Sequence, residues 1–327
     1  MADVPRVVMD PNATYRRLVP VDRLSPPVTP SDDVYVIAHM GIARVDVAQW
    51  RLRVDGLVER PWELDYDTLT ALPATEVTAV LECFGNPVEP EVATRRVGNV
   101  VWRGVRLAHL LERAGVRPEA RYVCPEGLDF GSFANVHSDR YVKDLPLARA
   151  LDPDVLVAWA MNGEPLTAEH GFPARVFVPG YFGTNAVKWL SRITLAAARP
   201  DSLFTTRLYN RRVDGEMQPV RELDVHAVIV TPSDGATLAR GRHTIAGWAW
   251  SHWPVRAVEV STDDGGTWQA ARVVPRGPDQ QWQAFTCAWD AAAPGRYELH
   301  VRATDEHARV QPSAGRNRIH TISVVVA

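Results

Sequence analysis

Two patterns of hydrophobic and polar positions divide this chain. Up to about residue 200, helical and strand patterns are mixed. In VRLAHLLERAG (105–115) the apolar residues recur at the spacing of one helix face, and Gly115 stands where a C-terminal cap would. Shorter helices are predicted at 66–72, before Pro73, and within LPLARAL (145–151). Buried strands are predicted for three apolar, β-branched runs bounded by Pro or Gly, which are RYVCPEG (121–127), VLVAW (155–159) and ARVFVPG (174–180).

The start of the chain carries weaker signals. The first 33 residues are rich in Pro and charge and have little periodicity, so we expect an irregular arm. A strand pattern begins near Val34. The run WRLRVDGLV (50–58) alternates apolar and polar side chains, and Asp55-Gly56 predicts a hairpin turn within it.

Beyond about residue 225 the pattern is that of strands alone. Turn signals separate six strand-like segments, which are VHAVIV, HTIAGWAW, AVEVST, QWQAFTCAW, YELHVRA and IHTISVVV. Short strands at this spacing predict an immunoglobulin-like sandwich of roughly 100 residues. The chain is thus predicted to consist of an irregular arm (1–33), a mixed α and β domain (34–200), a polar and basic connector (201–224) and a sandwich (225–327).

Composition narrows the class of protein. The chain has 327 residues, 46% of them apolar, which suffices for two hydrophobic cores. Its net charge of -3 gives no overall field that would attract nucleic acid or an anionic membrane. The three cysteines lie far apart and form neither a disulfide framework nor a CxxC pair. The chain also has no apolar stretch of membrane-spanning length, so we expect a cytoplasmic protein, with export by a removed signal as the alternative.

One cysteine stands out by its position. In VLECFGNP (80–87) a strand-like run leads to Cys83, directly before Gly85-Asn86, where a turn would expose the side chain. From this segment alone, an inert buried thiol and a metal-binding thiolate are both open.

A longer segment resolves this choice by resemblance. MNGEPLTAEHGFPARVFVPGYFGTNAVKWLSRI (161–193) resembles the sulfite oxidase family of molybdopterin-dependent oxidoreductases, and VLECFGNP resembles that family's cysteine motif. Further similarity lies at 102–111, 123–129 and 247–268, so the resemblance covers most of the chain from Val34 onward. It implies an α+β molybdopterin domain followed by an all-β immunoglobulin-like sandwich domain, which commonly forms the interface of a homodimer.

The resemblance also assigns residues. Cys83 would be the only protein ligand to molybdenum, a role that suits a soft thiolate. Basic side chains and a carboxylate would hold the phosphate and the polar ring of the pterin. The implied cofactor-binding residues are Tyr35, Val36, Ile37, Ala38, His39, Cys83, Asp129, His170, Arg175, Ala186, Val187 and Lys188. Structural alternatives remain, because Arg175 and Lys188 could be strand-end charges, Asp129 could initiate a turn, and His39 could be an ordinary surface or core histidine.

The chain departs from the family at its substrate arginines. Ile37 and Val88 stand where the family has arginine, and Trp159 replaces an active-site tyrosine. Because a buried charge that loses its partner typically costs about 2 to 5 kcal/mol, sulfite binding should be weak unless Arg95 or Arg96 supplies the charge. We therefore take as candidate catalytic residues Cys83, which the resemblance implies, together with Trp159, Arg95 and Arg96. Together with Phe84, these replacements predict a less polar pocket.

We therefore expect oxygen-atom transfer on a small substrate that is less anionic than sulfite. A sulfite oxidase with relocated arginines and a non-catalytic molybdopterin-binding protein are the alternatives. No CxxCH haem motif is present, so an external electron carrier is expected and haem is not. Trp248, Trp250 and Trp253 would serve either the dimer interface or the sandwich core.

Overall fold

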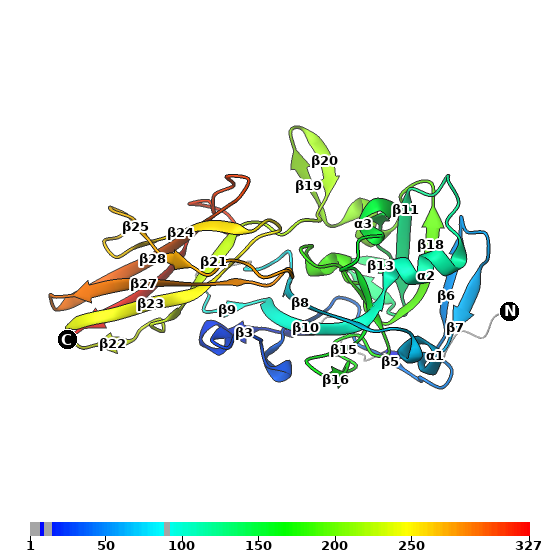
Figure 1. Cartoon of the computed structure of the whole chain (residues 1–327), viewed down its shortest axis with the longest axis horizontal. Helices are drawn as coiled ribbons and strands as arrows, with labels where there is room; N and C mark the ends of the chain where they lie inside the picture. The colour runs from blue at the N-terminus through cyan, green and yellow to red at the C-terminus, as the bar shows by residue number, and fades with distance from the viewer. Residues whose placement is uncertain (1–6, 10–14, 88–91) are drawn as a thin grey trace. The chain divides into compact units, whose positions relative to one another are not determined.

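The computed structural model describes residues 7–9, 15–87 and 92–327. These residues form two compact units, each built from segments that are far apart in the sequence. The first unit runs to Arg17 and then takes in Val36–Val77 and Val101–Arg221, and the second takes in Leu18–Tyr35, Thr78–Val100 and Glu222–Ala327. The strands β8 (Thr75–Glu82) and β10 (Val97–Arg106) each run from one unit into the other (Figure 1). The boundaries predicted at residues 33, 200 and 224 stay a prediction.

Two sheets organise the first unit. One has the order β14 (Leu145–Pro146), β11 (Tyr122–Gly127), β18 (Leu190–Ala196), β6 (Leu52–Gly56) and β7 (Trp62–Leu64). Within it β6 and β18 are parallel and the other pairs antiparallel. In the other sheet β15 (Leu156–Met161) pairs antiparallel with β10, β16 (Glu164–Pro165) and β17 (Arg175–Phe177), and β8 lies beyond β10. The three buried strands predicted in this part of the chain are confirmed.

The helices are few and short, as predicted. In α1 (Tyr66–Ala71) the Asp65 carboxylate accepts the Thr68 N–H at 2.9 Å and so caps the first turn. Helix α2 (Leu107–Ala114) buries one apolar face and ends at Gly115, whose φ of 72° suits a residue without a side chain. The four-residue helix α3 (Leu147–Ala150) is the third α-helix within the described ranges. None of the helices in the described ranges is both long and apolar enough to cross a bilayer.

Two predictions for the N-terminal part were wrong. Strand β6 continues through Asp55 and Gly56, which pair with Thr194 and Leu195, and the turn to β7 follows later. Gly56 is required there because a Cβ would lie 2.3 Å from the Leu195 carbonyl oxygen.

The arm is also less irregular than predicted. Strand β1 (Val7–Met9) pairs with β5 (Ala43–Val45), and β2 (Tyr15–Arg17) pairs with β4 (Val36–Ala38). These strands are three residues long, too short to leave a readable alternation in the sequence.

The second unit contains the predicted sandwich. One sheet has the order β21 (His226–Thr231), β23 (Gly241–Trp250), β27 (Gln283–Ala291) and β26 (Arg272–Val273). The other has the order β22 (Thr237–Leu238), β29 (His320–Val326), β28 (Gly295–Asp305), β24 (Val255–Ser261) and β25 (Gln269–Ala270). Both sheets contribute to one core, in which Phe285 and Cys287 of β27 pack with Leu299 and Val301 of β28.

Segments from earlier in the chain complete the second unit. The short strands β3 (Val19–Pro20) and β9 (Thr94–Arg95) pair antiparallel, and the 3-10 helices η1 (Val21–Leu24) and η2 (Ser31–Asp33) follow β3. Trp248 donates to the Leu24 carbonyl oxygen at 2.6 Å and stacks on Trp282. Trp250 is buried and Trp253 is 37% exposed, so of these two only Trp253 is available on the surface of the unit.

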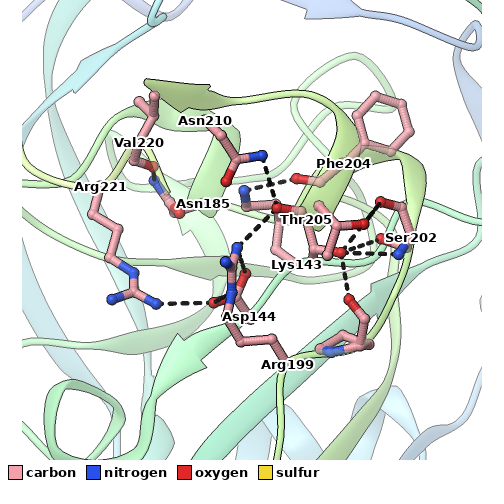
Figure 2. Close-up of polar contacts among 12 residues, drawn as sticks. Lys143, Asp144, Asn185, Arg199, Ser202, Phe204, Thr205, Asn210, Val220 and Arg221 are labelled. Atoms are coloured by element: carbon pink, nitrogen blue, oxygen red, sulfur yellow. Dashed lines mark hydrogen bonds and ion pairs between the residues drawn. The ribbon is translucent and has the colours of Figure 1, made fainter. Parts of the chain in front are cut away.

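The connector is ordered by ion pairs in the first unit. It contains the π-helix η4 (Leu203–Arg207) and the hairpin of β19 (Asn210–Val213) and β20 (Glu216–Pro219). The buried Asp144 carboxylate accepts from Arg199 at 2.9 and 3.1 Å and from Arg221 at 2.9 Å (Figure 2). Lys143 donates to the Phe204 carbonyl oxygen at 2.8 Å. Residues directly before β14 thereby hold both ends of the connector.

Candidate functional site

Cys83 lies between the end of β8 and a turn over residues 84–87. Its backbone N–H donates to the Arg96 carbonyl oxygen at 2.9 Å, and the residue is half-buried. Burial raises the pKa of the thiol, while hydrogen bonds from Gly85 and the Arg96 side chain and the charge of Arg96 lower it. The predicted turn at this cysteine is therefore confirmed, with a guanidinium beside the sulfur.

A buried carboxylate supports this turn. Glu82 Oε1 accepts from the Asn86 side chain at 3.0 Å, and Oε2 accepts from the Trp250 indole N–H at 2.8 Å. Asn86 Oδ1 in turn accepts the Arg96 N–H at 2.7 Å. Burial raises the pKa of Glu82 to about 7, although Arg316 and the two hydrogen bonds oppose the shift. The sequence reasoning missed Glu82 and Trp250, and the available signal was an acidic residue at the end of an otherwise apolar strand.

Only one of the two predicted arginines lies beside the thiol. Arg95 is 2% exposed, donates to the carbonyl oxygens of Val92 and Thr94 at 2.6 and 2.9 Å, and lines a cavity together with His320. The Arg96 side chain, by contrast, lies within hydrogen-bonding reach of Cys83. Of the two arginines, Arg96 is thus the one placed beside Cys83, and its role toward a substrate stays a prediction.

In the first unit the structure brings together most of the predicted cofactor-binding residues. Arg175, at the start of β17, donates to the carbonyl oxygens of His170 at 3.0 Å and Ala186 at 3.1 Å. Lys188 donates to the carbonyl oxygens of Glu169 at 2.8 Å and Ile37 at 3.0 Å. Segments from three parts of the chain therefore meet at one buried cation, Arg175, and one half-buried cation, Lys188. We call Asp129, His170, Arg175 and Lys188, together with Arg17, the basic cluster.

Electrostatics in the basic cluster favour an anion. Burial lowers the pKa of His170 to about 3, and the charges of Arg175, Lys188 and Arg17 add to the shift, so this imidazole is neutral. Arg17 Nη2 lies 3.5 Å from His170 Nε2. Arg17 was not predicted from the sequence. Among the described residues, the carboxylates that act on Lys188 are that of Asp129 and that of the half-buried Glu169, which Arg17 and Arg44 also approach. The cluster thus has an excess of positive charge.

The Asp129 carboxylate is a second group in the basic cluster that a ligand could satisfy. It is 4% exposed, and burial raises its pKa, while the nearby charge of Lys188 lowers it. Its Oδ1 atom is buried and accepts no hydrogen bond from any residue that the structure describes. An anionic phosphate and a heterocycle with ring N–H donors would satisfy both the excess charge and this acceptor, so the residues fit a pterin cofactor.

Two glycines make the basic cluster possible. A Cβ on Gly127 would lie 2.5 Å from Asp129 Oδ1 and 2.7 Å from the Lys188 carbonyl oxygen. Gly171, with a φ of 105°, would place a Cβ 2.9 Å from that of Lys188. Any larger side chain at either position would displace the cluster.

The residues of the predicted cofactor-binding loop, 35–39, differ in their surroundings. Tyr35, Val36 and Ala38 are buried, whereas the backbone of Ile37 reaches Lys188. His39 shares a hydrogen bond with the Tyr209 hydroxyl, and its ring lies 4.2 Å from that of Phe133 and 5.9 Å from that of Phe204. The sequence reasoning missed these three aromatic partners, which come from segments without a recognised motif.

Two further predicted residues, Trp159 and Val187, are buried. Trp159 is 6% exposed and packs in the hydrophobic core of the first unit. Val187 is also buried, and its carbonyl oxygen accepts the Val176 N–H at 2.9 Å. Val88 lies outside the described residues. Within the described ranges, His, Cys, Asp and Glu form no group of three or more that could hold a metal ion.

Comparisons with known proteins agree with this arrangement. Residues 39–204 match the model of the oxidoreductase molybdopterin binding domain, and residues 217–325 match that of the Mo-co oxidoreductase dimerisation domain. Mitochondrial sulfite oxidase from Homo sapiens is 35% identical over 319 residues, which cover 87% of this chain and 57% of that protein. Nitrate reductase [NADH] 1 from Oryza sativa subsp. japonica is 33% identical over 331 residues, which cover 87% of this chain and 36% of that protein.

A solved structure extends the similarity to the fold. Sulfane dehydrogenase SoxCD from Paracoccus pantotrophus is 29% identical, with a TM-score of 0.85 over 96% of this chain and 85% of that one. The chain spans little more than half the length of the human relative. Because one family model matches half of the chain and the other most of the rest, the chain belongs to the sulfite oxidase family of molybdopterin oxidoreductases.

Proposed function

We propose that this protein is a molybdenum cofactor-dependent oxidoreductase in which Cys83 is the protein ligand to the metal. The observation that carries the proposal is the basic cluster, whose excess positive charge and unmatched Asp129 oxygen suit a phosphorylated pterin. When bound, the cofactor would supply two-electron oxygen-atom transfer. The chain's own residues would bind and orient it and keep a cation beside the reacting centre.

Each residue group has a defined task under this proposal. Arg175 and Lys188 would attract the phosphate while their hydrogen bonds to backbone carbonyls fix the surrounding loops. The Cys83 thiolate is a soft donor that suits the metal, and Arg96 favours that thiolate over the thiol. Neutral His170 would hydrogen-bond the cofactor without adding charge.

A comparison of Cys83→Ser with the parent tests the metal assignment. We expect the parent to contain stoichiometric molybdenum. The variant should keep much of the pterin, because the basic cluster is intact, and should lose activity. Molybdenum would be measured by elemental mass spectrometry and the pterin by fluorescence after oxidative release. Cys287→Ser, which alters a buried cysteine of the sandwich core, is the matched control and should retain both. A fully active Cys83→Ser protein, or a parent without molybdenum, would refute the assignment.

For the substrate, we propose a small molecule that is less anionic than sulfite. Support comes from Arg95, which is directed into a separate cavity, and from the apolar side chains Ile37 and Phe84. The runner-up is a sulfite oxidase, because Arg96 lies beside Cys83 and the human relative bears that name. Steady-state kinetics with sulfite and an artificial one-electron acceptor distinguish the two, since a micromolar KM for sulfite would contradict the less polar pocket.

We also propose two partners, a second copy of this chain and an electron carrier. The match of residues 217–325 to a dimerisation domain supports a homodimer, for which the exposed Trp253 offers an apolar contact. An external one-electron carrier would exchange electrons with the cofactor. A non-catalytic molybdopterin-binding protein remains the third alternative, and stoichiometric molybdenum without turnover of any tested substrate would support it.

A further inference from the structure

The second unit contains a cavity of about 250 Å³ that has no part in the proposed function. Residues of β3, η1 and β9 line it together with residues of the sandwich strands β21 and β29. Val21, Ile229 and Ile322 make apolar walls, and Arg95 and His320 are the nitrogen-bearing side chains among the lining residues. Small-molecule sites commonly combine apolar walls with a few convergent polar groups, as this cavity does.

Arg95 is a buried cation that makes no ion pair with any acidic residue in the described ranges. Its Nη1 atom donates to the carbonyl oxygens of Val92 and Thr94, and its Nε atom is buried without a hydrogen-bond partner among the described residues. The two carboxylates that line the cavity, Asp22 and Asp234, make no ion pair with it within the described part of the chain, and Asp234 Oδ1 instead accepts the Ser323 N–H at 2.8 Å. Burial lowers the pKa of Arg95 to about 10. A buried guanidinium in this state is costly unless an anion accompanies it.

His320 provides a second hydrogen-bond donor among the lining residues. Its Nδ1 accepts the Ile229 N–H at 3.0 Å. Burial and the charge of Arg95 hold the pKa of His320 well below its ordinary value, so the ring is neutral. A neutral imidazole that accepts at Nδ1 carries its proton on Nε2, which makes that atom a hydrogen-bond donor.

We propose that this cavity binds a small organic carboxylate. Its oxygens accept hydrogen bonds from the Arg95 guanidinium and from His320 Nε2, and its hydrocarbon part contacts Val21, Ile229 and Ile322. A carboxylate matches the planar guanidinium and supplies a negative charge that no described residue provides in an ion pair. An inorganic oxyanion would leave the apolar walls without a partner. The cavity is smaller than typical drug-sized pockets, so a short chain fits it best.

Titration calorimetry with the purified full chain tests the proposal, with acetate, butyrate and sulfate as probes at pH 7. We expect saturable binding of one butyrate per chain, weaker binding of acetate because it lacks the apolar contacts, and the weakest binding of sulfate. Arg95→Met, which keeps the bulk but removes the charge, should weaken butyrate binding at least about thirtyfold. Arg240→Met removes an exposed arginine of the same unit and should leave binding unchanged.

The proposal would be overturned if butyrate showed no saturable binding or if the parent and Arg95→Met bound butyrate equally. It would also be overturned if sulfate or acetate bound as tightly as butyrate. Thermal unfolding of Arg95→Met establishes that the variant is folded, and His320→Leu, which removes the second donor, gives an independent check with the same expected direction. Binding is measured without turnover, so failure here leaves the molybdenum assignment untouched, and the reverse also holds.

Discussion

At the scale of single residues, one buried carboxylate holds the turn that carries Cys83. Both oxygens of Glu82 accept hydrogen bonds, one from Asn86 and one from Trp250. Through Asn86 this arrangement reaches the backbone of Arg96, the residue whose side chain faces the thiol. Glu82 therefore acts as a positioning residue for the metal-binding cysteine of the proposed function.

We expect Glu82→Gln to destabilise the protein by about 1 to 3 kcal/mol. The amide keeps one accepting oxygen but turns an NH₂ group toward either the Asn86 amide or the Trp250 indole, where two donors then face each other. Urea unfolding measures the change. The control Glu298→Gln alters a partly exposed carboxylate on β28 and should stay within about 0.5 kcal/mol of the parent. Equal stability of the two variants would show that Glu82 does not hold the turn.

At the scale of elements, one carboxylate organises the connector. Asp144 is fully buried at its side chain, and the arginines that it binds are 24% exposed. Burial alone would raise its pKa, but the hydrogen bonds and charges of Arg199 and Arg221 hold the pKa of Asp144 below its ordinary value. The buried Lys143 adds a further positive charge next to it. The single carboxylate therefore compensates several cations.

Asp144→Asn should lower the free energy of unfolding by about 3 kcal/mol, because it leaves two partly buried guanidinium groups without a counter-charge. Limited proteolysis should also cut the connector between residues 199 and 221 faster than in the parent. The same substitution at Asp214, exposed at the tip of the β19–β20 hairpin, is the control, and asparagine tolerates its φ of 49°. A connector that resists proteolysis equally in both variants would contradict this account.

Elements were predictable from sequence where one pattern ran long enough. Helix α2 shows a full apolar face and a glycine cap, and β27 alternates Phe285, Cys287 and Trp289 toward the core. The prediction failed at Asp55-Gly56, because pairing with β18, about 140 residues later, carries the strand through a typical turn sequence. Local propensity cannot report on a partner that distant.

In the candidate site, too, some residues were predictable from sequence and others were not. Family motifs located His170, Arg175 and Lys188, which contact each other's loops. They did not locate Tyr209 beside His39, nor the bond between Glu82 and Trp250, whose positions are 168 residues apart. They also did not distinguish Arg95, which lines a cavity, from Arg96, which lies beside Cys83.

At the scale of the whole molecule, both units contain imidazoles that stay neutral in the folded protein. His170 lies in the first unit, and His226 and His320 lie in the second. His226 is 1% exposed, and neither of its ring nitrogens has a hydrogen-bond partner within the described ranges. Burial and the charges of Arg95 and Arg316, together with His320, hold its pKa well below the ordinary value.

This arrangement makes the fold sensitive to acid. Between the pKa of an unfolded histidine, about 6.5, and the much lower pKa in the folded state, only the unfolded chain binds the proton. Stability therefore falls as the pH drops through this window, by about 1.4 kcal/mol per pH unit for each such histidine. The raised pKa values of Glu82 and Asp129 act in the opposite direction, since there the folded state holds the proton more tightly.

Replacing a single histidine isolates its contribution from these opposing groups. Between pH 6.5 and 5.0 we expect His226→Leu to lose about 2 kcal/mol less stability than the parent does, because its unfolded state no longer gains that proton. Urea unfolding at both pH values gives the difference. His109→Leu, an exposed histidine of α2, should retain the acid sensitivity of the parent. If His226→Leu lost as much stability as the parent, His226 would have to be protonated in the folded protein, and its burial without a partner would not govern its charge.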